Sequence, residues 1–351
     1  MNQKEKIKLF RDVFAPKSGE KILFLIDTPH DNIVDNQVWQ DRREMAKEWL
    51  NLFKNMGVKE GFSVEMQEYN ATGVHNAPIS QEIIHTISNY NLVIAMTEFS
   101  ASSSLYPLKN RKDINIRCAS MPGVERRMEG TAFRADYSDV QIYANNIKKL
   151  LTKAIGAEVL FSTGDHLFLD LRNRDGLAEG GVCREAGQVI NFPSGEGFIA
   201  PYEGIGEDVK EFGESKTQGI LPDNQHGDLI KYKVKNNKIV EVLGKGENVE
   251  KMRRFFEEDD THRNIAELGV GCNPEAVVSG NILEDEKVSG LHIAYGMNSQ
   301  FGGRVDSDMH QDICFPKGLP GAAKTLTLFN EDGSTIELIK DGELRYDLLK
   351  S

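Results

Sequence analysis

A glycine-rich stretch near the C-terminus, SGLHIAYGMNSQFGGRVDSDMHQDICF (289–315), contains residue types that commonly bind metal ions. His310 and Asp312 are separated by one residue, and alternate side chains of a strand point to the same face. The HxD pair therefore offers an imidazole and a carboxylate side by side, which suits a divalent metal. A hydrogen-bonded His–Asp pair on a surface turn would have the same spacing, so other residues must decide between the two interpretations.

Four further donors precede this pair, most of them in apolar or glycine-rich surroundings: Glu196, Glu267, Glu286 and His292. A carboxylate in such surroundings is costly unless it is paired or bound to a metal. Structural alternatives exist: Glu196 capping backbone amides, Glu267 in a salt bridge, and His292 as a satisfied core histidine. Together, however, six nitrogen and oxygen donors without a cysteine suit one or two divalent ions such as Zn, Mn, Co or Fe.

The first part of the chain (1–155) alternates between strand-like and helix-like segments. Short apolar or alternating runs predict strands, and apolar residues at helical spacing predict helices. We expect strands at 21–27, 62–69, 91–99 and 116–124, and helices at 39–57, 80–90 and 136–156. This alternation predicts an α/β domain with a doubly wound parallel sheet that is covered on both faces.

The second part (156–351) consists mainly of short strands joined by turns, with one helix expected at 247–260. Asn236-Asn237 and Asp332-Gly333 lie between apolar runs and are typical of hairpin turns. We therefore expect a β-rich α+β domain, and this domain carries the candidate metal site.

Composition excludes several classes of function. The 351 residues carry 42 Lys and Arg against 54 Asp and Glu, a formal net charge of -12, which argues against nucleic-acid and anionic-membrane partners. No apolar run approaches the ~18 to 20 residues that cross a bilayer, and the charged N-terminus does not resemble a signal peptide. The four cysteines are scattered, as in a reduced compartment. We expect a cytoplasmic protein.

In their order along the chain, these motifs resemble those of the M29 metallopeptidases, the aminopeptidase T family. NFPSGEGFIAP (191–201) matches a family segment N-x-P-x-x-E-x-F-x-x-P, and AELGVG follows with Glu267. DEKVSGLHIAYG matches an acidic pair followed by H-[IL]-A-x-G, and GGRVDSDMHQD matches GG-(x)-S-x-x-H-x-D. The resemblance covers most of residues 185 to 315.

The resemblance implies a two-metal aminopeptidase, with Zn, Co or Mn held by these six residues: Glu196, Glu267, Glu286, His292, His310 and Asp312. Glu267 would bridge the ions, an uncoordinated glutamate near the water would act as general base, and the candidate catalytic residues are Glu267 and Glu286. The gap from Glu286 to His292 is one residue longer than in the family, so Asp285 is an alternative at that position. The substrate would be a small peptide with a free amino terminus, and the enzyme would be a homodimer.

Three departures keep other functions open. The chain is shorter than a typical family member, the stretch between His292 and His310 is compressed, and Ser299 stands where the family has a tyrosine that would stabilise an oxyanion. The same superfamily includes shorter 2,5-dihydroxypyridine dioxygenases, whose mononuclear Fe(II) would need two histidines and a carboxylate, here His292, His310 and Asp312. A metal-binding relative without catalysis is a third possibility.

Overall fold

The structure is a computed structural model that describes residues 1–224 and 228–350 and divides the chain into two compact units. Unit 1 comprises Met1–Gln141, Gly181–Ser194 and Glu275–Glu284, and unit 2 comprises Ile142–Gly180, Gly195–Pro274 and Asp285–Ser351. The first boundary between the units therefore falls inside helix α5 (Tyr137–Lys153), before the boundary expected near residue 155, and two later segments belong to unit 1 again. Local sequence patterns mark elements but not their distant partners, which is why the interleaving was not anticipated.

Unit 1 contains a five-stranded sheet in the order β2-β1-β3-β4-β8, in which every neighbouring pair is parallel. Its strands are β1 (Lys21–Thr28), β2 (Ser63–Asn70), β3 (Leu92–Ala95), β4 (Arg117–Ser120) and β8 (Val189–Asn191). Its helices are α1 (Gln3–Phe14), α2 (Gln37–Glu60), α3 (Gln81–Ile87), α4 (Ser102–Leu105) and the first part of α5 (Tyr137–Lys153). The parallel sheet confirms the α/β character predicted for this part of the chain. The fifth strand, β8, comes from a segment that we expected in the β-rich half.

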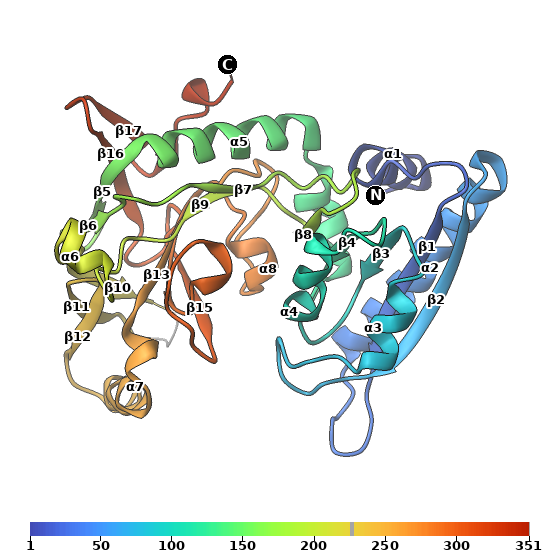
Figure 1. Cartoon of the computed structure of the whole chain (residues 1–351), viewed down its shortest axis with the longest axis horizontal. Coiled ribbons are helices and arrows are strands. Elements are labelled where there is room, and N and C mark those ends of the chain that lie inside the picture. The colour runs from blue at the N-terminus through green and yellow to red at the C-terminus, as the bar shows by residue number, and fades with distance from the viewer. Residues whose placement is uncertain (225–227, 351) are drawn as a thin grey trace. The chain divides into compact units, whose positions relative to one another are not determined.

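Alternate residues of β1 pack into two different hydrophobic clusters. Ile22, Phe24 and Ile26 belong to a cluster with residues of α1 and α2, whereas Leu23 and Leu25 belong to one with residues of α3 and α4. Because successive side chains of a strand point to opposite faces, both faces of this sheet are covered (Figure 1).

Unit 2 is built from two antiparallel sheets, ordered β12-β11-β10-β6-β5-β16-β17-β18 and β15-β14-β13-β9-β7. The strands of the first are β5 (Ala154–Phe161), β6 (His166–Asp170), β10 (Gln218–Asp223), β11 (Ile230–Lys235), β12 (Lys238–Leu243), β16 (Ala323–Asn330), β17 (Thr335–Lys340) and β18 (Glu343–Leu344). Those of the second are β7 (Leu177–Glu179), β9 (Glu196–Ile199), β13 (Ile265–Gly271), β14 (Gly290–Gly296) and β15 (His310–Cys314). Helices α6 (Asp208–Phe212) and α7 (Glu247–Glu258) and the larger part of α5 complete the α+β character of unit 2. Helix α8 (Ile282–Asp285) lies in unit 1 except for its last residue.

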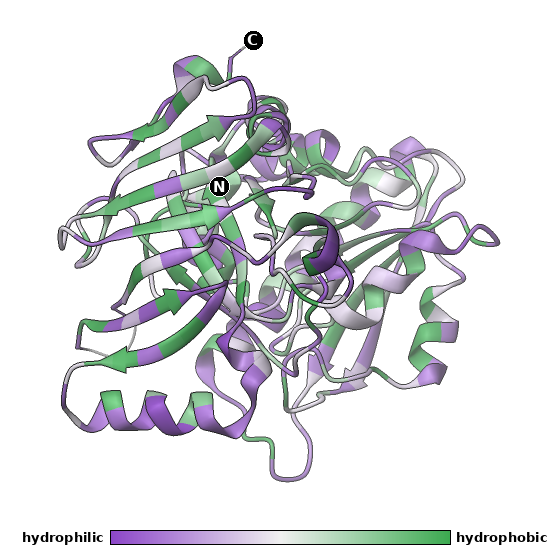
Figure 2. Ribbon diagram, turned by 60° about the vertical axis from the view of Figure 1, so that its left-hand side comes forward, coloured by the Kyte–Doolittle hydropathy of each residue, from purple (hydrophilic) through white to green (hydrophobic). Residues whose placement is uncertain are grey.

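One hydrophobic cluster joins the two sheets of unit 2, with members such as Val159 and Leu169 from the larger sheet and Leu268 and Ile293 from the smaller. Figure 2 shows hydrophobic and hydrophilic residues interspersed along the strands. The two predicted hairpin turns are confirmed. Asn236 and Asn237 both have positive φ, 50° and 63°, between β11 and β12, as a type I′ turn requires.

Candidate metal centre

Neighbouring strands of the smaller sheet carry most of the predicted donors. Glu196 begins β9, Glu267 lies on β13, His292 on β14, and His310 and Asp312 on β15. Since β15, β14, β13 and β9 are consecutive in the sheet, residues far apart in sequence come to one region. The strand predicted for the HxD pair is confirmed.

A glycine makes room for one of these side chains. Gly269 lies directly opposite His292 in the β13–β14 pair, and a Cβ atom added to Gly269 would be 1.9 Å from His292 Nε2. No other residue type therefore fits at this position without moving the imidazole.

The structure brings five of the six predicted residues into two overlapping groups of possible ligands. Glu196, Glu267 and His292 form one group, and Glu267, His310 and Asp312 form the other; within each, the donor atoms lie within 4.8 Å of one another. Glu267 belongs to both groups. Its Oε1 is 3.2 Å from His292 Nε2, and its Oε2 is 3.4 Å from His310 Nε2. One carboxylate thus presents each oxygen to a different histidine, as a bridging ligand would.

The two histidines differ in how their rings are held. His310 Nδ1 lies 2.7 Å from the carbonyl oxygen of Met297, so a proton on Nδ1 can be donated there while Nε2 keeps a lone pair for a metal. The Phe301 ring packs nearly perpendicular to the same imidazole, with centroids 5.2 Å apart. Within the described residues, by contrast, the buried Nδ1 of His292 has no hydrogen-bond partner.

Lys287 is a functional candidate that the sequence did not reveal. Its side chain is fully buried, and its Nζ pairs with Glu196 Oε1 at 2.5 Å and with Glu286 Oε1 at 2.7 Å. Among the residues that the structure describes, neither Glu286 nor the alternative Asp285 joins a group of possible ligands. The structure thus does not place Glu286 among the possible metal ligands, where the family resemblance put it, and its carboxylate pairs with Lys287 instead. A lysine beside an acidic pair is typical of an exposed surface, so only its burial distinguishes it.

Excess negative charge dominates the electrostatics of this cluster. Burial opposes ionisation of Glu267, but hydrogen bonds from His292 and His310 outweigh it and lower its pKa to about 2. Burial lowers the pKa of His292, but Glu267 and Glu196 outweigh this effect and raise the pKa to about 9. Burial also lowers the pKa of His310, but Asp312 and Glu267 hold it well above its usual value. Burial raises the pKa of Glu196 to about 7 even though Lys287 opposes this. The carboxylates therefore bind positive charge strongly, here as protons and an ammonium.

The donor set fits a divalent metal. All five residues are nitrogen or oxygen ligands, with no thiolate among them, which suits Zn, Mn, Co or Fe. Glu196 Oε2 is buried and makes no hydrogen bond in the described part of the chain, although His292 Nε2 lies 3.4 Å away. A bound cation would satisfy this buried carboxylate oxygen, which has no hydrogen-bond donor. Metal binding would displace the protons held on the histidines.

The tyrosine of the resembling family has no counterpart here. Ser299 begins a short 3₁₀ turn (Ser299–Phe301), and its hydroxyl donates a hydrogen bond to Asp306. Tyr295 lies on β14, but it packs in the hydrophobic core with Phe256. Because His292 and Tyr295 differ by an odd number of positions on one strand, their side chains point to opposite faces.

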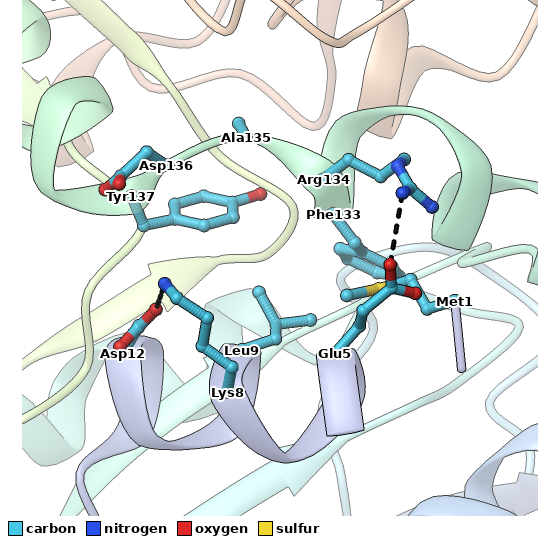
Figure 3. Close-up of a pocket in the computed structure, with 10 residues that line it drawn as sticks. All are labelled: Met1, Glu5, Lys8, Leu9, Asp12, Phe133, Arg134, Ala135, Asp136 and Tyr137. Carbon is cyan, nitrogen blue, oxygen red and sulfur yellow. Dashed lines mark hydrogen bonds and ion pairs between the residues drawn. The ribbon is translucent and has the colours of Figure 1, made fainter. Parts of the chain in front are cut away.

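A separate cavity of about 190 Å³ lies in unit 1 between α1 and the segment that leads into α5. Four of its five charged residues form two ion pairs: Lys8 pairs with Asp12 on α1, and Arg134 pairs with Glu5 at 3.3 Å (Figure 3). None of its lining residues belongs to the two groups of possible ligands. We find no catalytic arrangement in this cavity.

Comparison with known proteins shows the fold. No family model matches the sequence, and no curated protein does either. Two solved structures are similar over 98% of both chains: 2,5-dihydroxypyridine dioxygenase from Pseudomonas putida, with a TM-score of 0.70 and 15% identity, and AmpT from Thermus thermophilus, with a TM-score of 0.61 and 14% identity. In the described residues, no helix is long and apolar enough to cross a membrane. The chain thus shares its fold with AmpT and with a 2,5-dihydroxypyridine dioxygenase.

Proposed function

We propose that this protein is a metal-dependent hydrolase that removes N-terminal residues from peptides. The observation that carries the proposal is the position of Glu267, which presents one oxygen to His292 and the other to His310. Two metal ions sharing this carboxylate would polarise a scissile carbonyl and lower the pKa of a bound water. The fold shared with AmpT from Thermus thermophilus supports the proposal.

The side chains then have distinct roles. Glu196 and His292 hold one side of the centre, His310 and Asp312 hold the other, and Glu267 lies between them. Glu286 stands outside both groups, and burial raises the pKa of its carboxyl group despite the nearby Lys287. A carboxylate with a raised pKa suits proton transfer near neutral pH, so we assign Glu286 as the general base.

A mononuclear Fe(II) dioxygenase is the second candidate, and Lys287 is the observation that favours it. Its ammonium pairs with both Glu196 and Glu286, which reduces the carboxylates left for a second ion. The dioxygenase from Pseudomonas putida shares the fold. Against this candidate, the group that contains His310 and Asp312 includes one histidine, and its third member is Glu267. An aromatic dihydroxypyridine would be the substrate.

One experiment separates the candidates. The full-length protein is purified without chelator, its bound metals are counted by elemental analysis, and it is assayed for release of N-terminal residues from short peptides and for oxygen uptake with 2,5-dihydroxypyridine. Two Zn, Mn or Co ions with peptide cleavage would support the hydrolase. One Fe with oxygen uptake would support the dioxygenase and contradict the hydrolase. The homodimer stays a prediction that analytical ultracentrifugation can test.

A further inference from the structure

We infer that the two groups of ligands bind metal with unequal affinity: the group Glu267–His310–Asp312 fills first, and Lys287 weakens binding at the group Glu196–Glu267–His292. The inference rests on the proposed metal centre and adds an order of loading to it. It follows from three features of unit 2: the position of Lys287, the close packing around it, and the different support of the two histidines.

Lys287 places a positive charge next to the group Glu196–Glu267–His292. Its Nζ is 2.5 Å from Glu196 Oε1, and Glu196 belongs to the weaker group but not to the stronger one. A divalent ion on the other oxygen of Glu196 would lie close to this ammonium in a buried region, where repulsion between like charges is poorly screened.

The backbone around Lys287 is packed closely against β13, and its buried ammonium is held between two carboxylates. A Cβ atom at Gly271 would be 2.2 Å from the carbonyl oxygen of Val288 and 2.6 Å from that of Glu286. The turn around Lys287 therefore packs directly on the backbone of β13. The amide of Asn273 also donates a hydrogen bond of 3.0 Å to the carbonyl oxygen of Lys287.

The stronger group is better oriented. His310 has an outer partner in the carbonyl of Met297, 2.7 Å from Nδ1, whereas in the described residues Nδ1 of His292 has none. Outer partners of metal-bound histidines typically change metal affinity by about 10- to 100-fold. We therefore expect the two binding steps to differ by at least about tenfold.

The test is a titration of the metal-free full-length protein with Zn²⁺. Binding is measured by calorimetry and, independently, by equilibrium dialysis with elemental analysis. The wild type should show a tight step and a second step at least about tenfold weaker. Lys287→Met keeps a long side chain without the charge, and it should tighten the second step by about tenfold or more while leaving the first unchanged.

Two further variants keep the inference testable if K287M does not fold. His292→Gln should remove the weak step and leave the tight one, whereas Asp312→Asn should weaken the tight step. Equal affinities in the wild type, a second step that K287M leaves unchanged, or loss of the tight step in H292Q would overturn the inference while leaving the metal centre intact. Absence of any Zn²⁺ binding would instead overturn the proposed function, and the inference with it.

Discussion

Buried carboxylates occur in both units, but their surroundings differ. Asp27 at the end of β1 in unit 1 is fully buried and accepts hydrogen bonds from the Trp39 indole (3.0 Å) and from the backbone amides of Glu98 (2.8 Å) and Phe99 (3.0 Å). In unit 2, Glu267 faces two histidines, and the neighbouring Glu196 has an oxygen without a hydrogen-bond donor among the described residues. The first carboxylate is satisfied by the protein alone. The second set is not, which is what a site for an external cation requires.

The largest effect that would separate the two regions is expected for Glu267→Gln. The amide cannot bridge two cations as a carboxylate does, so we expect the number of bound metal ions to fall and peptide cleavage to be lost. Elemental analysis of the purified variant measures this. If metal content is unchanged and only the melting temperature falls, Glu267 is a salt-bridge residue.

Gly269→Ala should have the next largest effect, because the added Cβ would overlap the His292 imidazole. Overpacking of this kind costs about 1–3 kcal/mol, and displacement of the imidazole should also reduce metal binding. Gly130→Ala is a matched control, since a Cβ there meets no atom within 4 Å. Equal Zn²⁺ affinity of G269A and the wild type in calorimetry would show that His292 is not a ligand.

Asp27→Asn tests whether the buried carboxylate of unit 1 serves stability alone, in contrast to those of unit 2. Asparagine has one acceptor oxygen where aspartate has two, so at least one of the three donors loses its partner. A buried donor left unsatisfied costs about 1–3 kcal/mol. We expect a lower free energy of unfolding in urea with unchanged metal content. Loss of metal in D27N with an intact fold would remove the distinction between the two carboxylates.

The last effect requires no substitution and concerns pH. The pKa of His292 is raised to about 9 by Glu267 and its neighbours, so the imidazole is protonated at neutral pH in the metal-free protein. A metal requires the neutral form, so metal affinity should rise as pH increases from 6 to 9, by up to about tenfold per unit for each proton displaced. Calorimetry at several pH values, in buffers of different ionisation enthalpy, counts the protons. A flat profile would mean that no histidine changes protonation on binding.

The sequence predicted the local features of the centre well. The HxD spacing of His310 and Asp312 is a strand property, and β15 has that conformation. The parallel strands of unit 1 and the turn at Asn236-Asn237 follow from local apolar patterns and turn residues in the same way. The grouping of Glu267 with both histidines agrees with the role expected from the family resemblance, although ligation itself stays a prediction.

Features that depend on long-range packing were not accessible to the sequence. The strand Val189–Asn191 pairs with β4 in unit 1, and its three residues carry no mark of that distant partner. Burial of Lys287 depends on the close packing of the turn 286–288 against Gly271, which no local pattern encodes. The different outer partners of His292 and His310 likewise depend on where a loop carbonyl, that of Met297, falls in space.

Metal content tests the central claim most directly. His310→Ala removes a proposed ligand, whereas His262→Ala removes another buried histidine of unit 2 that pairs with Asp308 and lies outside both groups. We predict that wild type and H262A bind divalent metal and that H310A has lost at least one ion, with all three folded by circular dichroism. Equal metal content in H310A and the wild type would contradict the proposed centre.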